Sequence, residues 1–249
     1  MTLTVVIPSF GLVALLRACL MHLEIAITRA GLVDWRVAVV DNGSVTPYKP
    51  DQFEVKGLEL IRLDRRTSFS RACNAGAAGP ASKCLMFLNN DVLLHPRALA
   101  EMFALLAAPG IGICGARLVY PDERMQHCGV RFDGGPRAAH HEFHGWPSAS
   151  VSRLERHFQA VTAAALLIRG EVFSALGGFD ERYPFGYEDV DLCLRARHLG
   201  YSITCAQAVD SIHFESTSNQ DPRRHDASRA LFLERWSNRY TIDGEIPDE

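Results

Sequence analysis

Short runs of consecutive apolar residues alternate, in the first half of the chain, with longer stretches in which apolar residues recur every three or four positions. The runs occupy residues 5–7, 37–40 and 84–88, and a further predicted strand at 58–63 is interrupted by Glu59 and Arg62. Uninterrupted apolar runs of this length are typical of strands buried on both faces of a sheet. The stretches with helical spacing cover residues 12–27, 69–78 and 99–106. This alternation predicts an α/β fold with a mainly parallel central sheet flanked by helices.

Polar residues follow three of the predicted strands at the point where each strand ends. They are Pro8-Ser9, Asp41-Asn42 and Asn89-Asn90-Asp91. In an open α/β sheet the carboxyl ends of the strands line the binding crevice. The pattern therefore predicts a nucleotide site at this edge of the sheet.

The second half of the chain has a weaker pattern. Residues 121–150 are rich in Gly, Pro and His and predict a loop-rich region. Strands are predicted at residues 113–120 and 202–206, a regular pattern returns at 161–168, and a helix is predicted at 189–199. Because no repeat, low-complexity segment or linker divides the sequence, we interpret residues 1–249 as a single domain.

Asp91 directly follows a buried apolar strand and two short amides. A carboxylate at this place supplies oxygen ligands for Mg²⁺ or Mn²⁺, which need few carboxylates besides substrate phosphates. Asp is also common in turns and at helix N-caps. The residue alone does not separate these two interpretations.

Glu188 and Asp189 stand at the start of the predicted helix, after the turn-forming residues 177–180 and 184–186. Acidic residues in the first turn also stabilise a helix through its dipole, so one interpretation is purely structural. The other is chemical, because a carboxylate held on a shaped turn is suited to act as general base toward a substrate hydroxyl.

Charge and composition narrow the class of protein. The 249 residues carry 26 Lys and Arg against 29 Asp and Glu, a net charge of -3, which disfavours nucleic acid as a partner. The seven cysteines form no C-x-x-C pair and several lie in apolar runs, which favours a reducing compartment. The sequence shows no signal peptide and no apolar run of ~20 residues. We therefore expect a cytoplasmic protein, and a peripheral association with the inner face of the cell membrane stays open.

Five blocks of sequence occur in the order that they have in one known family. They are VIPSF (6–10), VDNGS (40–44), FSRACNAG (69–76), FLNND (87–91), and GGFD (177–180) with GYEDVDL (186–192). On these blocks the chain resembles the inverting family-two glycosyltransferases with the GT-A fold, particularly bacterial rhamnosyltransferase-like members. The resemblance implies a Rossmann-like nucleotide-diphosphosugar transferase domain, with a donor half over about residues 1–110 and an acceptor half over about 111–249.

The resemblance also implies roles for single residues. The residues it places at the nucleotide-sugar donor are Pro8, Ser9, Asp41, Asn42, Asn74, Asn89 and Asn90. Asp91 and His213 would hold a divalent cation, Mn²⁺ or Mg²⁺, and Asp189 would be the catalytic base with Glu188 beside it. Asn89 stands where the family commonly has the first Asp of a D-x-D motif, so most of the coordination would fall to Asp91.

The implied activity is inverting, metal-dependent transfer of a hexosyl or deoxyhexosyl group from a dTDP- or UDP-sugar. The acceptor would be a hydroxyl of a saccharide or lipid-linked saccharide in bacterial surface polysaccharide synthesis. Tyr187 and Trp146 are candidates for stacking on the acceptor sugar, although each also fits a core aromatic.

Other patterns in the sequence suggest other functions. Residues 110–115 match G-x-G-x-x-G but lead into a predicted strand, the reverse of a dinucleotide fingerprint. His140, His141, Glu142 and His144 suggest a metal-dependent hydrolase, but their spacing and the flanking Gly and Pro favour a loop over the active site. Two other functions stay open: a sugar-phosphate nucleotidyltransferase, and a catalytically silent nucleotide-sugar binding module.

Overall fold

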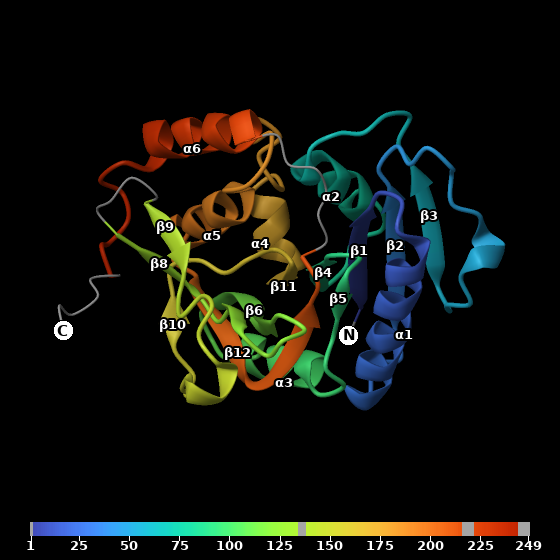
Figure 1. Cartoon of the computed structure of the whole chain (residues 1–249), viewed down its shortest axis with the longest axis horizontal. Helices are drawn as coiled ribbons and strands as arrows, with labels where there is room; N and C mark the ends of the chain where they lie inside the picture. Colours follow the sequence, from blue (N-terminus) through green and yellow to red (C-terminus); the bar gives the residue numbers. More distant parts are fainter. Residues whose placement is uncertain (1, 134–137, 216–221, 244–249) are drawn as a thin grey trace.

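A ten-stranded sheet forms the centre of the computed structural model, which describes residues 2–133, 138–215 and 222–243 (Figure 1). The strand order is β10-β12-β6-β11-β4-β1-β2-β3, with β5 paired to β12 and β7 to β6. The strands are β1 (Leu3–Ser9), β2 (Trp35–Asp41), β3 (Leu58–Arg62), β4 (Cys84–Leu88), β5 (Val92–Leu93), β6 (Ile111–Val119), β7 (Met125–His127), β10 (His157–Phe158), β11 (Ala165–Arg169) and β12 (Ser202–His213). A separate hairpin consists of β8 (Val130–Phe132) and β9 (Ala139–His141).

The predicted parallel sheet is confirmed for the first half of the chain, where β4, β1, β2 and β3 pair in parallel. The second half is mixed, because β11 runs antiparallel to both β4 and β6. An apolar run encodes burial but not direction, so the sequence pattern did not distinguish the two.

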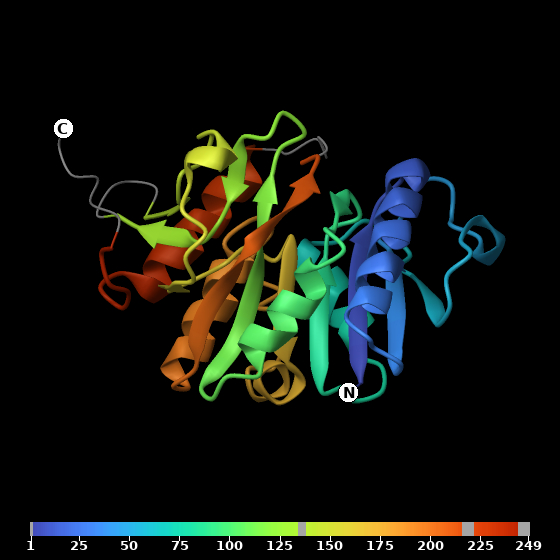
Figure 2. The same ribbon diagram turned by 90° about the horizontal axis from the view of Figure 1, so that it is seen from below.

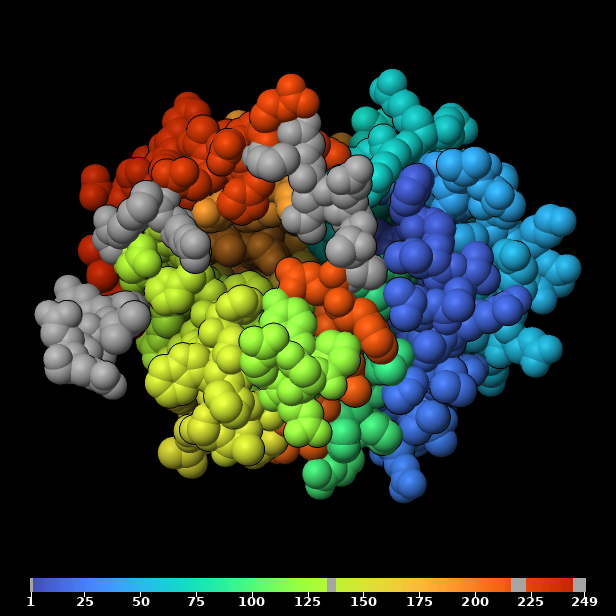
Figure 3. Space-filling model, in the orientation of Figure 1, coloured from blue at the N-terminus to red at the C-terminus, as the bar shows by residue number. Residues whose placement is uncertain are grey.

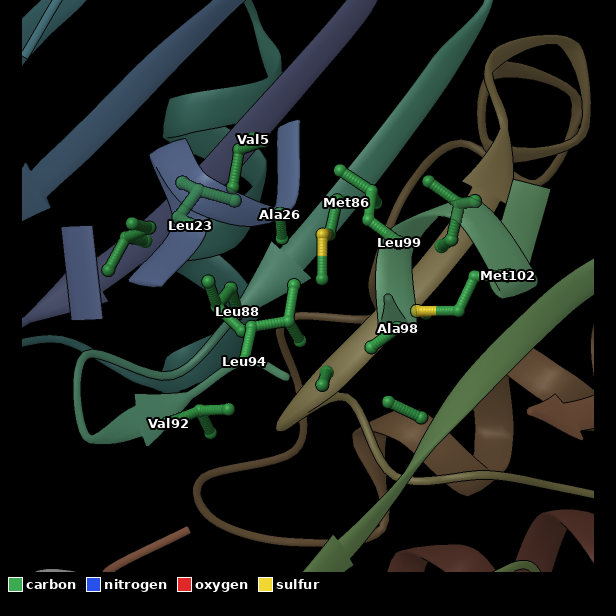
Figure 4. Close-up of a cluster of buried hydrophobic side chains, with 14 of the residues drawn as sticks. Val5, Leu23, Ala26, Met86, Leu88, Val92, Leu94, Ala98, Leu99 and Met102 are labelled. Carbon is green, nitrogen blue, oxygen red and sulfur yellow. The ribbon is translucent and has the colours of Figure 1, made fainter. Parts of the chain in front are cut away.

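Helices cover both faces of the sheet, α1 (Val13–Arg29) and α3 (Ala98–Leu106) on one face (Figure 2). The opposite face carries α2 (Phe69–Ala77), α4 (Gly170–Ala175), α5 (Glu188–His198) and α6 (Pro222–Trp236). Successive side chains of a strand point to opposite faces, so Val5 and Ile7 pack toward α1 while Val6 packs toward α2. Figure 4 shows the first of these cores, with side chains of β1 and β4 against Leu23 and Leu99. Burying each such side chain contributes roughly 1.5–3 kcal/mol.

The loop-rich region predicted at residues 121–150 contains β7, the β8–β9 hairpin and a 3-10 turn, Ser148–Ser150; a second such turn is Pro50–Gln52. These strands are only three residues long, too short for a period to be visible in the sequence. β12 extends to His213 instead of ending near residue 206, and its pairing with β6 shifts register between Ala206 and Ser211. Polar residues after residue 206 interrupt the apolar pattern, so the sequence did not predict the second half of the strand.

Arg117 is fully buried on β6 and holds the segment after β7–β9 in place. Its guanidinium pairs with Asp210 at 2.7 Å and donates to the carbonyls of Ser148, Val151 and Ser152. A buried Arg is stable only when its donors are matched in this way.

The two halves of the chain lie side by side in Figure 3, with the first strands and helices, blue to teal, on one side. Within the part of the chain that the structure describes, no helix is long and apolar enough to cross a membrane.

Candidate functional site

A cavity of about 2030 Å³ opens at the carboxyl ends of β1 and β4 and extends under α6. Both halves of the chain line it. The predicted site residues on its wall are Pro8, Ser9, Asn42, Asn89, Asn90, Asp91, Trp146, Tyr187, Glu188, Asp189 and His213. Two predicted residues, Asp41 and Asn74, are not on the wall.

Ser9, at the end of β1, is held by hydrogen bonds on both sides. Its Oγ accepts from Asn90 Nδ2 at 2.7 Å and lies 2.8 Å from Tyr48 Oη. Tyr48 Oη donates to the carbonyl of Gly11, so the hydroxyl of Ser9 is the donor to Tyr48. The end of β1 and the loop after β4 are therefore locked together at the cavity.

Asp41 is buried and its carboxylate is taken up by the protein itself. It accepts from Arg62 at 2.6 Å and from the backbone N–H groups of Ser44 and Tyr48. Burial alone would raise its pKa, but these hydrogen bonds lower the pKa below its usual value. This placement favours a role in shaping the turn after β2, not direct contact with a ligand.

Asn42 lies on the wall but also braces the neighbouring loop, since its Oδ1 accepts from the backbone and hydroxyl of Thr67. Next to Thr67, the guanidinium of Arg66 lies over the ring of Phe10, 4.3 Å from its centroid. Both side chains line the cavity. They form a flat cationic and aromatic surface at the end near β1.

Asn74, on α2, braces the turn that precedes α5. Its Oδ1 accepts from Phe179 N at 2.9 Å, and its Nδ2 donates to Phe179 O and to Glu181. Gly178 has a φ of 83°, and a Cβ there would lie 2.7 Å from Asn74 Oδ1. Asn74 therefore packs against a turn that requires glycine, about 100 residues later in the chain. This packing favours a structural role for Asn74.

Asp91 and His213 are brought together by the pairing of β5 with β12, which sets His213 opposite Val92. His213 Nε2 lies 3.2 Å from Asp91 Oδ1 and 3.3 Å from Asn89 Nδ2. Both residues are buried yet line the cavity. One imidazole nitrogen and one carboxylate oxygen suit Mn²⁺ better than Mg²⁺, which prefers oxygen ligands alone.

The described residues contain no group of three or more His, Cys, Asp or Glu side chains arranged to hold a metal. A divalent cation in a phosphate-binding site takes one or two protein ligands and completes its shell from substrate and water. The donor set at Asp91 and His213 therefore fits a cation that binds together with a phosphorylated ligand.

Glu188 and Asp189 begin α5, and the two carboxyl groups have different environments. Asp189 accepts from the backbone N–H groups of Ala163 at 3.0 Å and Val190 at 2.8 Å, which fixes its orientation. Glu188 is buried, and its Oε2 has no hydrogen-bond partner among the described residues. Burial and the charge of Asp189 raise the pKa of Glu188 to about 8.

Asp191, two residues further on, anchors this helix. Its fully buried carboxylate accepts from Arg195, Trp236 and Arg235 at 2.7 to 3.1 Å. It thereby ties α5 to α6 and fixes the first turn of α5, on which Glu188 and Asp189 lie.

The two predicted aromatic residues differ in exposure. Tyr187 is only 9% exposed and packs against Phe232 and His225 of α6. Trp146 is 56% exposed at the cavity wall, with its ring against Phe143. An exposed ring on a cavity wall is the more accessible surface for a ligand.

Several wall residues carried no signal in the sequence. Tyr120, Gln126 and Glu215 come from β7 and segments beside it and are linked to His213 by hydrogen bonds. The β8–β9 hairpin, with His140 and His141, lies at the cavity, where the sequence predicted a loop over the active site. Residues 111–115 lie in β6, so the G-x-G-x-x-G match leads into a strand, as predicted, and is not a dinucleotide fingerprint.

Comparisons with known proteins give the family and the fold. The model of "Glycosyl transferase family 2" matches residues 4–132. The chain is 32% identical over 203 residues to the O-antigen biosynthesis protein RfbC of Myxococcus xanthus, covering 78% of this chain and 16% of that protein. It is 28% identical over 235 residues to the N-acetylglucosaminyl-diphospho-decaprenol L-rhamnosyltransferase of Mycobacterium tuberculosis, covering 82% and 76%.

Among solved structures, a mannosyltransferase of Pyrobaculum calidifontis in complex with GDP-Man and Mn²⁺ superposes with a TM-score of 0.66 at 15% identity. The match covers 96% of this chain and 65% of that one. At this identity the match shows the fold, which is that of the GT-A glycosyltransferases, as predicted. The chain spans a quarter or less of the length of the first curated relatives it matches.

Proposed function

The chain belongs to glycosyl transferase family 2, and on that premise we propose that it transfers a sugar from a nucleotide-diphosphate donor to a hydroxyl acceptor with inversion. The observation that carries the proposal is that one cavity holds both the Asp91–His213 pair and the Glu188–Asp189 pair. The relatives named for O-antigen and rhamnosyl transfer support a role in bacterial surface polysaccharide synthesis.

The donor nucleotide, a dTDP or UDP sugar in this proposal, binds at the end of the cavity near β1. Pro8 and Ser9 form the floor there, and Phe10 with Arg66 offers a flat surface for a nucleobase. Asn89 and Asn90 face the same space and supply amide donors for the diphosphate. Asp41 and Asn74 support the donor site without contacting the donor, because their polar atoms already bind protein groups.

Asp91 and His213 are the proposed ligands of a divalent cation, with Mn²⁺ favoured by the imidazole. When bound, such a cation stabilises the negative charge that develops on the leaving diphosphate. Asn89 contributes no charge, so the affinity of this pair for a cation depends strongly on the donor phosphates.

Asp189 is the proposed general base. Two backbone N–H groups hold its carboxylate, and each carboxylate oxygen retains a lone pair for an acceptor hydroxyl. Glu188, with its raised pKa, keeps its proton near neutral pH and offers a donor to the same hydroxyl. Asp189 removes the hydroxyl proton while the acceptor oxygen attacks the anomeric carbon from the face opposite the diphosphate, and a single displacement inverts the configuration.

The acceptor occupies the cavity between the β8–β9 hairpin and α6, where Trp146 presents an exposed ring to a sugar face. The relative that acts on a diphospho-decaprenol-linked sugar supports a lipid-linked saccharide as acceptor.

Transfer assays test this function. We expect the purified chain to release nucleotide diphosphate from one member of a panel of dTDP, UDP and GDP sugars with Mn²⁺, and the product to have inverted anomeric configuration by NMR. Asp189→Asn should bind the donor normally and lose about 10²–10⁴-fold in kcat. Full activity of Asp189→Asn rules out the assigned base. Tight nucleotide binding without turnover, with every donor and acceptor, supports a silent binding module instead.

A further inference from the structure

His213 is one end of a chain of hydrogen bonds that the sequence did not reveal. Its Nδ1 lies 2.6 Å from Gln126 Oε1, and Gln126 Nε2 lies 3.2 Å from Glu215 Oε2. The same Glu215 oxygen accepts from Tyr120 Oη at 2.5 Å, and that hydroxyl lies 3.0 Å from His144 Nε2. The five side chains come from four separate segments and all line the cavity.

The donor and acceptor properties of these groups allow only one direction of donation along this chain of hydrogen bonds. A carboxylate accepts and does not donate, so Glu215 requires the amide nitrogen of Gln126 to face it. The amide oxygen of Gln126 must then face His213, because the reverse orientation would set two acceptors against each other. An amide oxygen accepts only, and therefore Nδ1 of His213 carries the ring proton.

In the neutral ring, which is the form that binds a metal ion, the other nitrogen is then a bare lone pair. Asn89 Nδ2, an obligate donor, lies 3.3 Å from His213 Nε2, which agrees with an acceptor at that position. Asp91 Oδ1 lies 3.2 Å from the same nitrogen. An imidazole lone pair and a carboxylate oxygen at this separation repel each other, and a cation placed between them relieves the repulsion.

We propose that Gln126 and Glu215 are positioning residues that hold His213 in the tautomer required to bind a divalent cation with Asp91. The inference rests on the proposed function, since the cation belongs to the donor site described there. Gln126 is buried, so its contacts with neighbouring side chains set the orientation of its amide. Partners of this kind fix the ring orientation and raise the basicity of a ligating histidine.

Gln126→Met tests the inference because it keeps the volume and removes the acceptor. With Mn²⁺ titrated into the protein in the presence of UDP and followed by electron paramagnetic resonance, we expect affinity to fall about 10- to 100-fold. Gln159→Met is the matched control, because Gln159 is another buried glutamine whose side chain is hydrogen-bonded to Thr241 and Asp243 instead of to His213. The control should bind Mn²⁺ as the wild type does.

Exchange of the two side chains provides a rescue. In Gln126→Glu combined with Glu215→Gln, position 126 still accepts from His213 Nδ1, and position 215 now donates to it. We expect the double variant to recover most of the Mn²⁺ affinity that Gln126→Met loses. A merely structural role for Gln126 predicts no such recovery.

The ¹⁵N NMR signals of the His213 ring give a readout that needs neither metal nor activity. At about pH 8.5, above the ordinary range for imidazole, we expect Nδ1 protonated and Nε2 bare in the wild type, and a mixture of tautomers in Gln126→Met. A wild-type ring protonated at Nε2 overturns the inference. So does Mn²⁺ affinity in Gln126→Met equal to that of the wild type. A wild type that binds no Mn²⁺ overturns the inference together with the cation of the proposed function, whereas transfer activity without Asp189 overturns only the proposed base.

Discussion

Glu188→Gln isolates the energetic cost of a buried acid at the start of α5. The side chain of Glu188 is 8% exposed and its Oε2 has no hydrogen-bond partner among the described residues. Burial, and then the charge of Asp189, raise its pKa from 4.5 to about 8. Gln resembles the protonated acid in shape but cannot ionise, so the variant removes the titration and little else.

The sign of the effect follows from where the proton binds more tightly. Between pH 4.5 and 8 the folded chain holds a proton on Glu188 that the unfolded chain has released, so stability falls as pH rises. Each pH unit in this interval corresponds to about 1.4 kcal/mol. The full contribution is present below pH 4.5, and about 4–5 kcal/mol is lost by pH 8 and above.

Urea unfolding followed by tryptophan fluorescence at a series of pH values measures this difference. We expect the free energy of unfolding of wild type relative to Glu188→Gln to fall by about 2–4 kcal/mol between pH 5.5 and 8. Glu54→Gln, at an exposed position, is the control and should run parallel to the wild type. If Glu188→Gln also runs parallel to the wild type, the carboxyl group ionises normally and the reasoning from burial is refuted.

Three further predictions test other parts of the site. Asn74→Ala removes the hydrogen bonds that hold Phe179, so the free energy of unfolding should fall by about 1–3 kcal/mol. The nucleotide Kd, measured by calorimetry, should not change. Weaker nucleotide binding at unchanged stability would make Asn74 a direct ligand. Arg117→Leu leaves the buried carbonyls of Ser148 and Val151 without this donor and leaves Arg153 as the cationic partner of Asp210. Unfolding should therefore cost about 3 kcal/mol less, and an unchanged Tm would contradict this. Asp91→Asn should weaken Mn²⁺ binding by tenfold or more, about 1.4 kcal/mol, in the same titration as above, while Asp122→Asn, on the exposed turn before β7, should not.

The candidate site was partly predictable from the sequence. Ser9, Asn89-Asn90-Asp91 and Glu188-Asp189 were found because each lies at the end of a strand or the start of a helix, where local patterns are visible. The parallel order of β1 and β4 brings Ser9 and Asn89-Asn90-Asp91 to one edge of the sheet, whereas Glu188 and Asp189 reach the same cavity only through the packing of α5. Asp41 and Asn74 belong to the same motifs, but whether a polar atom faces the ligand or a neighbouring segment depends on side-chain contacts that no motif encodes.

The sequence by itself determined the α/β class, because apolar runs and helical periods are local consequences of burial. It also indicated the parallel first half of the sheet, because strands that alternate with helices are joined by crossover connections. Tertiary structure alone decided the antiparallel direction of β11, the length of β12 and the meeting of His213 with Asp91. It also assembled Tyr120, Gln126 and Glu215 around that histidine. The contacts of His213, Gln126 and Glu215 join residues about 90 or more positions apart, and they depend on the register of β12, which shifts along β6 and pairs with the two-residue strand β5.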